Sequence, residues 1–124
     1  MLDQLRIFNL KKFKDDRGYF QETFNSLISK EIGAEFLQDN ESLSKQGVIR
    51  GMHYQWDAPM GKLVRCSYGT IIDVVVDIRE GSPDCGLPKY FTLSSFNSEC
   101  LWVPPGFAHG FEVLSSEALV SYKC

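Results

Sequence analysis

The sequence lacks the features that would point to a membrane or a nucleic-acid partner. It has no apolar run near the roughly 18 to 20 residues that a membrane span needs, and its N-terminus, MLDQLRIFNLKKFKDD, has no signal-peptide core. It has no basic excess either, because 13 Lys and Arg stand against 16 Asp and Glu. We therefore expect a cytoplasmic protein that binds neither membranes nor nucleic acid.

Groups that bind metals or form disulfides are also scarce. No CxxC pair occurs among the four cysteines, Cys66, Cys85, Cys100 and Cys124. This spacing predicts neither a zinc knuckle nor a dense disulfide framework, so we expect free thiols. The chain has only two histidines, too few for the usual three-histidine metal site.

Short β-rich runs fill most of the chain and are separated by Gly, Pro, Asn and Ser. They are residues 48–54, 62–78, 90–96, 100–104, 110–114 and 118–122. Runs this closely spaced, without a long amphipathic helix between them, predict an antiparallel sandwich or barrel. The one helix candidate is Asn25 to Ile32, which Asn25 or Ser26 could cap and Gly33 could end. A chain of 124 residues predicts a single domain, 1–124.

The run from residue 62 to residue 78 is the most informative one. Gly69 predicts a hairpin turn inside it, and GSPDCG at 81–86 predicts a loop after it. Asp73 and Asp77 are an even number of residues apart, so on one strand they share a face with Val75. The apolar residues at 72, 74, 76 and 78 pack on the other face. Two acids on one face of an apolar strand suggest that this face lines a polar cavity.

His53 lies in the run IRGMHYQ, where strict alternation sets His53 and Gln55 on one face and Arg50 and Tyr54 on the other. Pointing inward, His53 would bring a proton acceptor to the cavity wall, with the Gln55 amide beside it. The alternative is a core histidine that binds a backbone carbonyl.

Three more side chains have both a chemical and an ordinary structural interpretation. His109, in FAHGF, either faces the same cavity or only belongs to a turn at the start of a strand. Lys62 is a cation for an oxyanion if it points inward, and a solvated lysine if it points outward. Tyr122 is either a cavity residue or ordinary aromatic packing in a sheet.

Several motifs resemble one known family, the dTDP-4-dehydrorhamnose 3,5-epimerases, often called RmlC. They are DDRGYFQETF, FLQDNESLS, GVIRGMHYQ, GKLVRCSYGTIIDVVVDIREGSPDCG and WVPPGFAHGFEVLSSEALVSYK, in the family's order from about residue 13 to residue 123. The resemblance implies an all-β, cupin-type double-stranded β-helix (a jelly-roll barrel) with one or two short peripheral helices. It also implies a homodimer without metal or organic cofactor, which epimerises a dTDP-4-keto-6-deoxyhexose at C3 and C5.

The resemblance also carries residue roles onto this chain. It implies that His53 is the general base, Tyr122 the general acid and Lys62 the group that holds the keto oxygen. His109 then lines the sugar site with Asp73 as its partner. The implied substrate-binding residues are Arg17, Phe20, Glu22, Gln38, Asn40 and Arg50, of which the first three reach into the neighbouring subunit's site.

The chain departs from the family pattern at one point, and alternatives to this function stay open. Family members continue for several dozen residues beyond Cys124, so we expect that their C-terminal segment is not part of this domain. A relative that acts at one carbon, a ketoisomerase on a similar nucleotide sugar and a non-catalytic nucleotide-sugar-binding cupin are all compatible with the residues. A metal-dependent cupin is disfavoured, because its motif needs a cluster such as HxH where this chain has His53-Tyr54-Gln55.

Overall fold

The computed structural model describes residues 4–57 and 59–124, which form eleven strands and one helix. The strands are β1 (Arg6–Asn9), β2 (Lys12–Asp15), β3 (Gly18–Gln21), β4 (Asp39–Lys45), β5 (Ile49–His53), β6 (Lys62–Tyr68), β7 (Thr70–Asp77), β8 (Pro88–Ser94), β9 (Glu99–Val103), β10 (Phe107–Val113) and β11 (Glu117–Lys123). The helix α1 is Ser26–Ile32.

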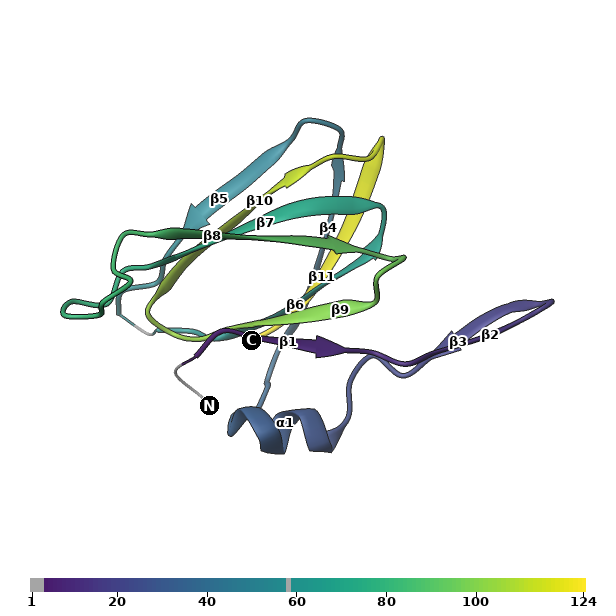
Figure 1. The fold of residues 1–124 in the computed structure, drawn as a ribbon, viewed down its shortest axis with the longest axis horizontal. Coiled ribbons are helices and arrows are strands. Elements are labelled where there is room, and N and C mark those ends of the chain that lie inside the picture. The colour runs from purple at the N-terminus through teal and green to yellow at the C-terminus, as the bar shows by residue number, and fades with distance from the viewer. Residues whose placement is uncertain (1–3, 58) are drawn as a thin grey trace.

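Two antiparallel sheets face each other and form the body of the protein (Figure 1). One has five strands in the order β1-β9-β6-β11-β4, and the other has four in the order β5-β10-β7-β8. Strands that are neighbours in the chain often lie in different sheets, as β6 and β7 do. This arrangement confirms the predicted antiparallel sandwich or barrel.

The main core lies between the two sheets and is built from alternate residues of their strands. Its buried members are Val64, Cys66, Ile71, Val75, Leu93, Leu101, Val103, Phe111, Val113, Ala118 and Val120. Burying a Val, Leu, Ile or Phe side chain contributes about 1.5 to 3 kcal/mol. In β7 every second residue from Ile71 to Asp77 is buried, which confirms the predicted alternation, but the expected packing of residues 72, 74 and 76 on the other face is wrong, because they are only half-buried and the core takes Ile71 and Val75. The acids of this strand therefore enter the same interior as the apolar core.

The helix α1 covers the outer face of the five-stranded sheet (Figure 1). Its Ile32 packs in a second core with Leu63 and Trp102. The Asn25 side chain accepts hydrogen bonds from the N–H groups of residues 27 and 28, at 3.0 and 3.1 Å. Gly33 ends the helix in a left-handed conformation, with φ +82°. The predicted helix and both of its boundaries are confirmed.

Gly69 does not form the predicted hairpin turn. It joins β6 to β7, which lie in different sheets, so it is a corner at which the chain crosses from one sheet to the other. Its φ is +83°, and a Cβ atom there would lie 2.2 Å from the carbonyl oxygen of Glu117. The predicted loop at 81–86 is confirmed, because it lies between β7 and β8, which do pair.

The hairpin of β2 and β3 projects away from the body (Figure 1). It carries exposed aromatic side chains, among them Phe13, Tyr19 and Phe20, which are 51%, 58% and 68% exposed. Three large aromatic residues on a projecting hairpin are a surface that a second molecule could cover.

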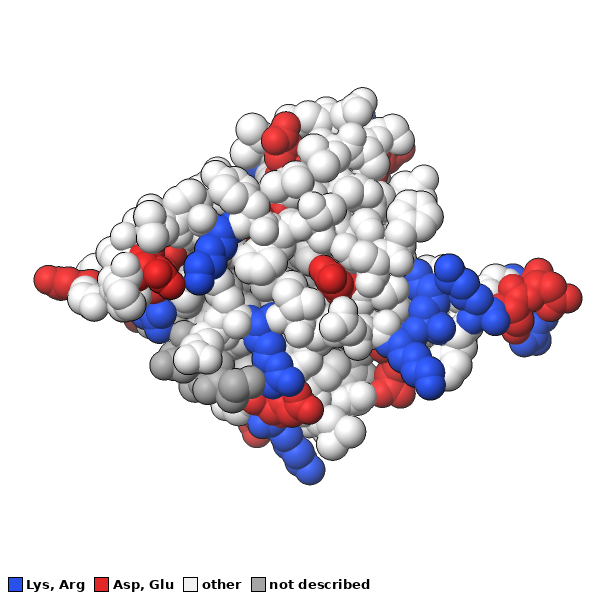
Figure 2. Space-filling model, viewed as in Figure 1, with Lys and Arg blue, Asp and Glu red and all other residues white. Residues whose placement is uncertain are grey.

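Charges of both signs are interspersed on the face drawn in Figure 2, including the projecting hairpin. In the part of the chain that the structure describes, no helix has the length and apolar character to cross a membrane. All four cysteines are free thiols, as predicted.

Candidate active site

Two adjoining chambers lie at the end of the barrel where β5 ends and β6 and β10 begin. The Phe107 chamber, of about 290 Å³, is lined by His53, Tyr54, Gln55, Met60, Lys62, Val103, Gly106, Phe107 and His109. The Tyr122 chamber, of about 150 Å³, is lined by Ser42, Arg50, His53, Lys62, His109, Gly110, Phe111, Val120 and Tyr122. The two chambers share His53, Lys62 and His109, so these three side chains stand where the chambers meet.

A bulge in β5 brings Arg50 and His53 to the same side. His109 of β10 pairs with His53, and Phe111 pairs with Arg50, so β5 has one residue more than β10 over this interval. The predicted strict alternation, which set Arg50 and His53 on opposite faces, is therefore wrong. Gly51 lies in the bulge with φ +103°, and a Cβ there would lie 2.7 Å from the carbonyl oxygen of His109. Only glycine lets the two strands approach this closely.

His109 and Asp73 form a buried pair. Nε2 of His109 lies 2.7 Å from Oδ2 of Asp73, and Asp73 is fully buried. Burial raises the pKa of Asp73, and the hydrogen bond and charge of His109, with the charge of Lys62, oppose this rise. The hydrogen bond fixes the His109 ring through Nε2, which leaves Nδ1 for other partners. Asp73 does not line either chamber itself, so it acts on them through His109.

Lys62 is the first residue of β6, as predicted, and its side chain is turned toward the chambers. Its Nζ lies 5.5 Å from the centroid of the Tyr122 ring. An ammonium group over an aromatic face is attracted by the ring quadrupole. Lys62 therefore points inward, and this contact with Tyr122 crosses from β6 to its neighbour β11.

His53 differs from His109 because its imidazole is exposed and has no hydrogen-bond partner among residues 4–57 and 59–124. A ring without a fixed partner can turn toward a bound molecule. The alternative of a core histidine bonded to a backbone carbonyl is therefore wrong for His53.

Three of the six expected substrate-binding residues lie on β4, β5 and the segment before β4. Arg50 lines the Tyr122 chamber, and its Nε donates a 2.7 Å hydrogen bond to Oγ of Ser44. Gln38 donates to the Asn40 side chain at 3.0 Å, and Asn40 donates to the sulfur of Cys124 at 3.4 Å. Asn40 pairs with Tyr122 across β4 and β11, which brings Gln38 and Asn40 to the side of the barrel where Tyr122 lies.

The other three, Arg17, Phe20 and Glu22, lie at or next to the projecting hairpin and line neither chamber of this chain. The Arg17 side chain is 86% exposed and pairs with Asp15 at 2.7 Å. Glu22 accepts a hydrogen bond from Asn25 at 2.6 Å. Within one chain the structure does not bring these residues to the chambers.

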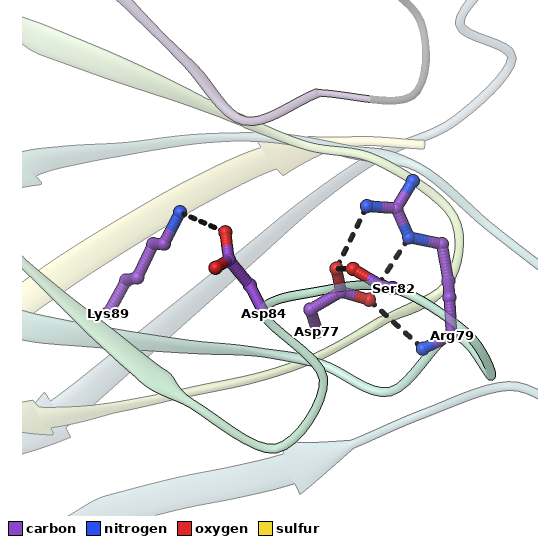
Figure 3. Close-up of polar contacts among 5 residues, drawn as sticks. All are labelled: Asp77, Arg79, Ser82, Asp84 and Lys89. Carbon is purple, nitrogen blue, oxygen red and sulfur yellow. Dashed lines mark hydrogen bonds and ion pairs between the residues drawn. The ribbon is translucent and has the colours of Figure 1, made fainter.

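Asp77 and Asp73 do not line one polar cavity together, which corrects the sequence-based expectation. Asp77 lines a separate hollow and is bound by its own loop (Figure 3). Its carboxylate accepts hydrogen bonds from the backbone N–H, Nε and Nη2 of Arg79, at 3.0, 3.0 and 2.9 Å, and from the hydroxyl of Ser82. The Arg79 side chain holds the pKa of Asp77 far below its usual range. We call Asp77, Arg79 and Ser82 the clasp. The spacing D-x-R-x-x-S after a strand was the signal for it in the sequence.

No three His, Cys, Asp or Glu side chains come together in metal-binding geometry in the described part of the chain. Asp73 is paired with His109, and Asp77 is paired with Arg79. The chambers are therefore lined by two imidazoles, an ammonium group, a guanidinium group and two phenols. These groups can move protons and stabilise negative charge.

The model of the dTDP-4-dehydrorhamnose 3,5-epimerase family matches residues 1–124. The chain belongs to this family. A curated family member from Methanothermobacter thermautotrophicus is 49% identical over 125 residues, which cover 99% of this chain and 68% of that protein. The solved structure of RmlC from Legionella pneumophila, a complex with dTDP-4-keto-L-rhamnose, has a TM-score of 0.92 at 46% identity and covers 97% of this chain and 65% of that one.

A third relative acts at one position. The solved structure of ChmJ, a 3'-monoepimerase from Streptomyces bikiniensis in complex with dTDP-quinovose, has a TM-score of 0.90 at 27% identity and covers 97% of this chain and 63% of that one. These likenesses confirm the predicted all-β, cupin-type fold of the family. The chain spans about two thirds of the length of the relatives it matches.

Proposed function

We propose that this chain epimerises a dTDP-4-keto-6-deoxyhexose at C3 and C5, by proton transfer through an enolate and without a metal or organic cofactor. One observation carries the proposal: His53, Lys62 and His109, from three different strands, line two chambers in common, and Tyr122 lines one of them. Membership of the epimerase family supports the same reaction.

His53 is the general base in this proposal. The protons at C3 and C5 of a 4-keto sugar are acidic because C4 is a carbonyl, and a neutral imidazole with a reference pKa of about 6.5 suits their removal. His53 is an exposed residue at the junction of both chambers, where its imidazole can accept such a proton.

Lys62 and His109 stabilise the enolate that forms. Negative charge moves onto the C4 oxygen as the proton leaves, and preorganised positive groups in a partly dry site lower the energy of that charge. Lys62 brings a full charge to the chambers. His109, whose ring is held through Nε2 by Asp73, lines the same chambers and adds a polar group beside Lys62.

Tyr122 is the general acid. Inversion requires that the new proton arrive on the opposite face of the sugar ring, so a second proton-transfer group must stand across from His53. Tyr122 comes from β11 of the five-stranded sheet, whereas His53 comes from β5 of the four-stranded sheet. The two groups thus approach the Tyr122 chamber from opposite sheets.

Nucleotide binding falls to Arg50, Gln38 and Asn40 of this chain, and a guanidinium group suits a diphosphate because it can donate two parallel hydrogen bonds. Arg17, Phe20 and Glu22 serve the neighbouring subunit of a homodimer, since their hairpin projects away from its own chambers. Val74 and Tyr90 lie on the outer face of the four-stranded sheet, where Tyr90 is 65% exposed, and such an apolar face suits a second copy.

The expected cytoplasmic location stays part of the proposal, because free thiols suit a reducing compartment.

The activity is tested with purified chain and dTDP-4-keto-6-deoxyglucose, with product configuration at C3 and C5 read from proton couplings by NMR. Inversion at both carbons supports the proposal. Inversion at one carbon supports a single-carbon epimerase, movement of the carbonyl from C4 to C3 supports a ketoisomerase, and binding without change supports a non-catalytic cupin.

Assembly is tested by sedimentation. We expect a dimer at micromolar concentration, and an Arg17→Ala chain that still dimerises but binds dTDP more weakly. The composite site would be contradicted if the unsubstituted chain sedimented as a monomer and the Arg17→Ala chain bound dTDP with the same affinity as the unsubstituted one.

A further inference from the structure

The clasp reaches the Phe107 chamber through an aromatic ring. The guanidinium carbon of Arg79 lies 4.8 Å from the centroid of the Phe107 ring, within the range of a cation–π contact. Phe107 lines the chamber that holds His53, Lys62 and His109. It also lines a separate hollow of about 380 Å³ that includes Asp77 and Arg79. Phe107 is therefore the wall between the two hollows, and Arg79 is in contact with it.

The backbone before Phe107 is held by the same loop. The N–H of Ile78 donates a 3.1 Å hydrogen bond to the carbonyl oxygen of Gly106. Gly106 has φ +92°, and a Cβ atom there would lie 2.6 Å from Cγ of Arg79. The aliphatic stem of Arg79 thus lies against the backbone of Gly106. The Gly106 backbone and the Phe107 ring are therefore both held, three and two residues before His109.

The Arg79 side chain is itself fixed. Its Nε and Nη2 both donate to the Asp77 carboxylate, which is only 4% exposed, and Ser82 donates to the same carboxylate. A side chain held by a fork of two hydrogen bonds retains little rotamer freedom. A surface arginine without these contacts could not hold a neighbouring ring in one place.

A fixed apolar wall matters for a 6-deoxy sugar. Such a sugar carries a methyl group on C5, and Phe107, Val103 and Met60 are the apolar side chains of its chamber. Proton transfer from carbon is sensitive to misplacement of the reacting atoms by about 1 Å. A wall that moves would change the distances from His53 to the protons at C3 and C5 by different amounts.

We propose that Arg79 is a positioning residue: held by Asp77 and Ser82, it fixes Phe107 as the apolar wall of the Phe107 chamber and so sets how the sugar's C3 and C5 are presented to His53. This inference rests on the proposed function and adds to it a residue outside both chambers.

The first test compares Arg79→Met with Lys89→Met. Methionine keeps an apolar stem but removes the charge over Phe107. Lys89 lies near the clasp and pairs with Asp84 at 3.4 Å (Figure 3), so its substitution removes a neighbouring charge without touching the clasp. We expect Arg79→Met to raise KM by up to about 30-fold, because substrate binding must then supply the energy with which the cation–π contact held Phe107 in place. We also expect it to change the ratio of solvent deuterium at C3 to that at C5, with the pH profile of kcat unchanged.

A double substitution separates positioning from general loosening of the fold. If Arg79 acts through Phe107, then Arg79→Met has little further effect on the deuterium ratio in a Phe107→Leu background. Ser82→Ala is the milder variant if Arg79→Met does not fold, and it should shift the ratio in the same direction by less. Additive effects of Arg79→Met and Phe107→Leu, or a ratio that matches the Lys89→Met control, would overturn the inference.

A further measurement does not need turnover. With ¹³C-labelled phenylalanine rings, the Phe107 resonance should move in Arg79→Met and stay in place in Lys89→Met. If the unsubstituted chain exchanges no deuterium, the proposed function fails, and this resonance still decides whether Arg79 positions Phe107. An unmoved resonance overturns the inference whatever the activity.

Discussion

Asp77→Asn tests whether the clasp stabilises the fold. The substitution keeps the shape of the side chain and replaces one carboxylate oxygen by an NH₂ group. In the unsubstituted chain, Oδ1 of Asp77 accepts hydrogen bonds from the backbone N–H and Nε of Arg79. Oδ2 accepts hydrogen bonds from Nη2 of Arg79 and from the Ser82 hydroxyl. The Ser82 hydroxyl can turn and accept from the new NH₂ group. Nη2 of Arg79 cannot, because a guanidinium group has only donors.

The expected loss follows from these contacts. One charge-assisted hydrogen bond is removed, and such bonds contribute about 1.5 to 3 kcal/mol each. Arg79 also loses its counter-charge, but its side chain is 38% exposed, so water replaces part of that interaction. We therefore expect Asp77→Asn to lower the free energy of unfolding by about 2 to 3 kcal/mol. For a domain of this size, such a loss lowers Tm by about 8 to 12 °C at pH 7.

The loss of stability caused by Asp77→Asn should be smaller in acid. The pKa of Asp77 is lowered in the folded state, so its contribution to stability is present above the unfolded pKa and is lost as pH falls toward the folded pKa. With an unfolded Asp pKa of about 3.9, about 1.3 kcal/mol of the contribution is gone by pH 3.

Urea unfolding followed by circular dichroism at pH 7 and pH 3 measures both effects. Lys89→Met is the control and should change stability by less than about 1 kcal/mol, because its ion pair is exposed. An Asp77→Asn chain as stable as the unsubstituted one at pH 7, or a loss equally large at pH 3, would refute this account of the clasp.

Three further predictions concern the chambers. His53→Ala should lower the exchange rate about 10²- to 10⁴-fold with dTDP-sugar affinity little changed, and near-normal exchange would assign the base elsewhere. Lys62→Met should cause a comparable loss of kcat, and His109→Ala a smaller one, because Lys62 carries the permanent charge; the reverse order in steady-state kinetics would contradict this. Gly51→Ala should separate β5 from β10 and lower both Tm and kcat, because its Cβ would lie 2.7 Å from a backbone oxygen; unchanged values of both would argue against the tight approach.

Local patterns in the sequence predicted much of the fold. The alternation of Asp73 and Val75 follows from the period of a strand, and the helix boundaries follow from Asn25 and Gly33, whose side-chain and backbone properties act over a few residues. The strand β4 escaped prediction because DNESLSK is polar and only its alternate residues turn inward. The hairpin predicted at Gly69 is wrong, because the local sequence is the same for a turn within one sheet and for a corner between two sheets.

In the candidate site, too, local sequence predicts the residue types but not how the strands bring them together. The residue types at His53, Lys62 and His109 could be read from motifs, but their meeting at one junction depends on strand order across two sheets. The bulge that turns Arg50 to the side of His53 needs the partner strand to reveal it. The roles of the site residues stay predictions, and so does the contribution of Arg17 to a neighbouring subunit.

The most direct measurement of the central proposal is solvent deuterium incorporation. The purified chain is incubated with dTDP-4-keto-6-deoxyglucose in D₂O, and the mass of the recovered nucleotide sugar is read, with the His53→Ala chain as the matched control. The proposal predicts two deuterons, at C3 and C5, with the unsubstituted chain and almost none with the control. No incorporation by the unsubstituted chain, or equal incorporation by both chains, would contradict it.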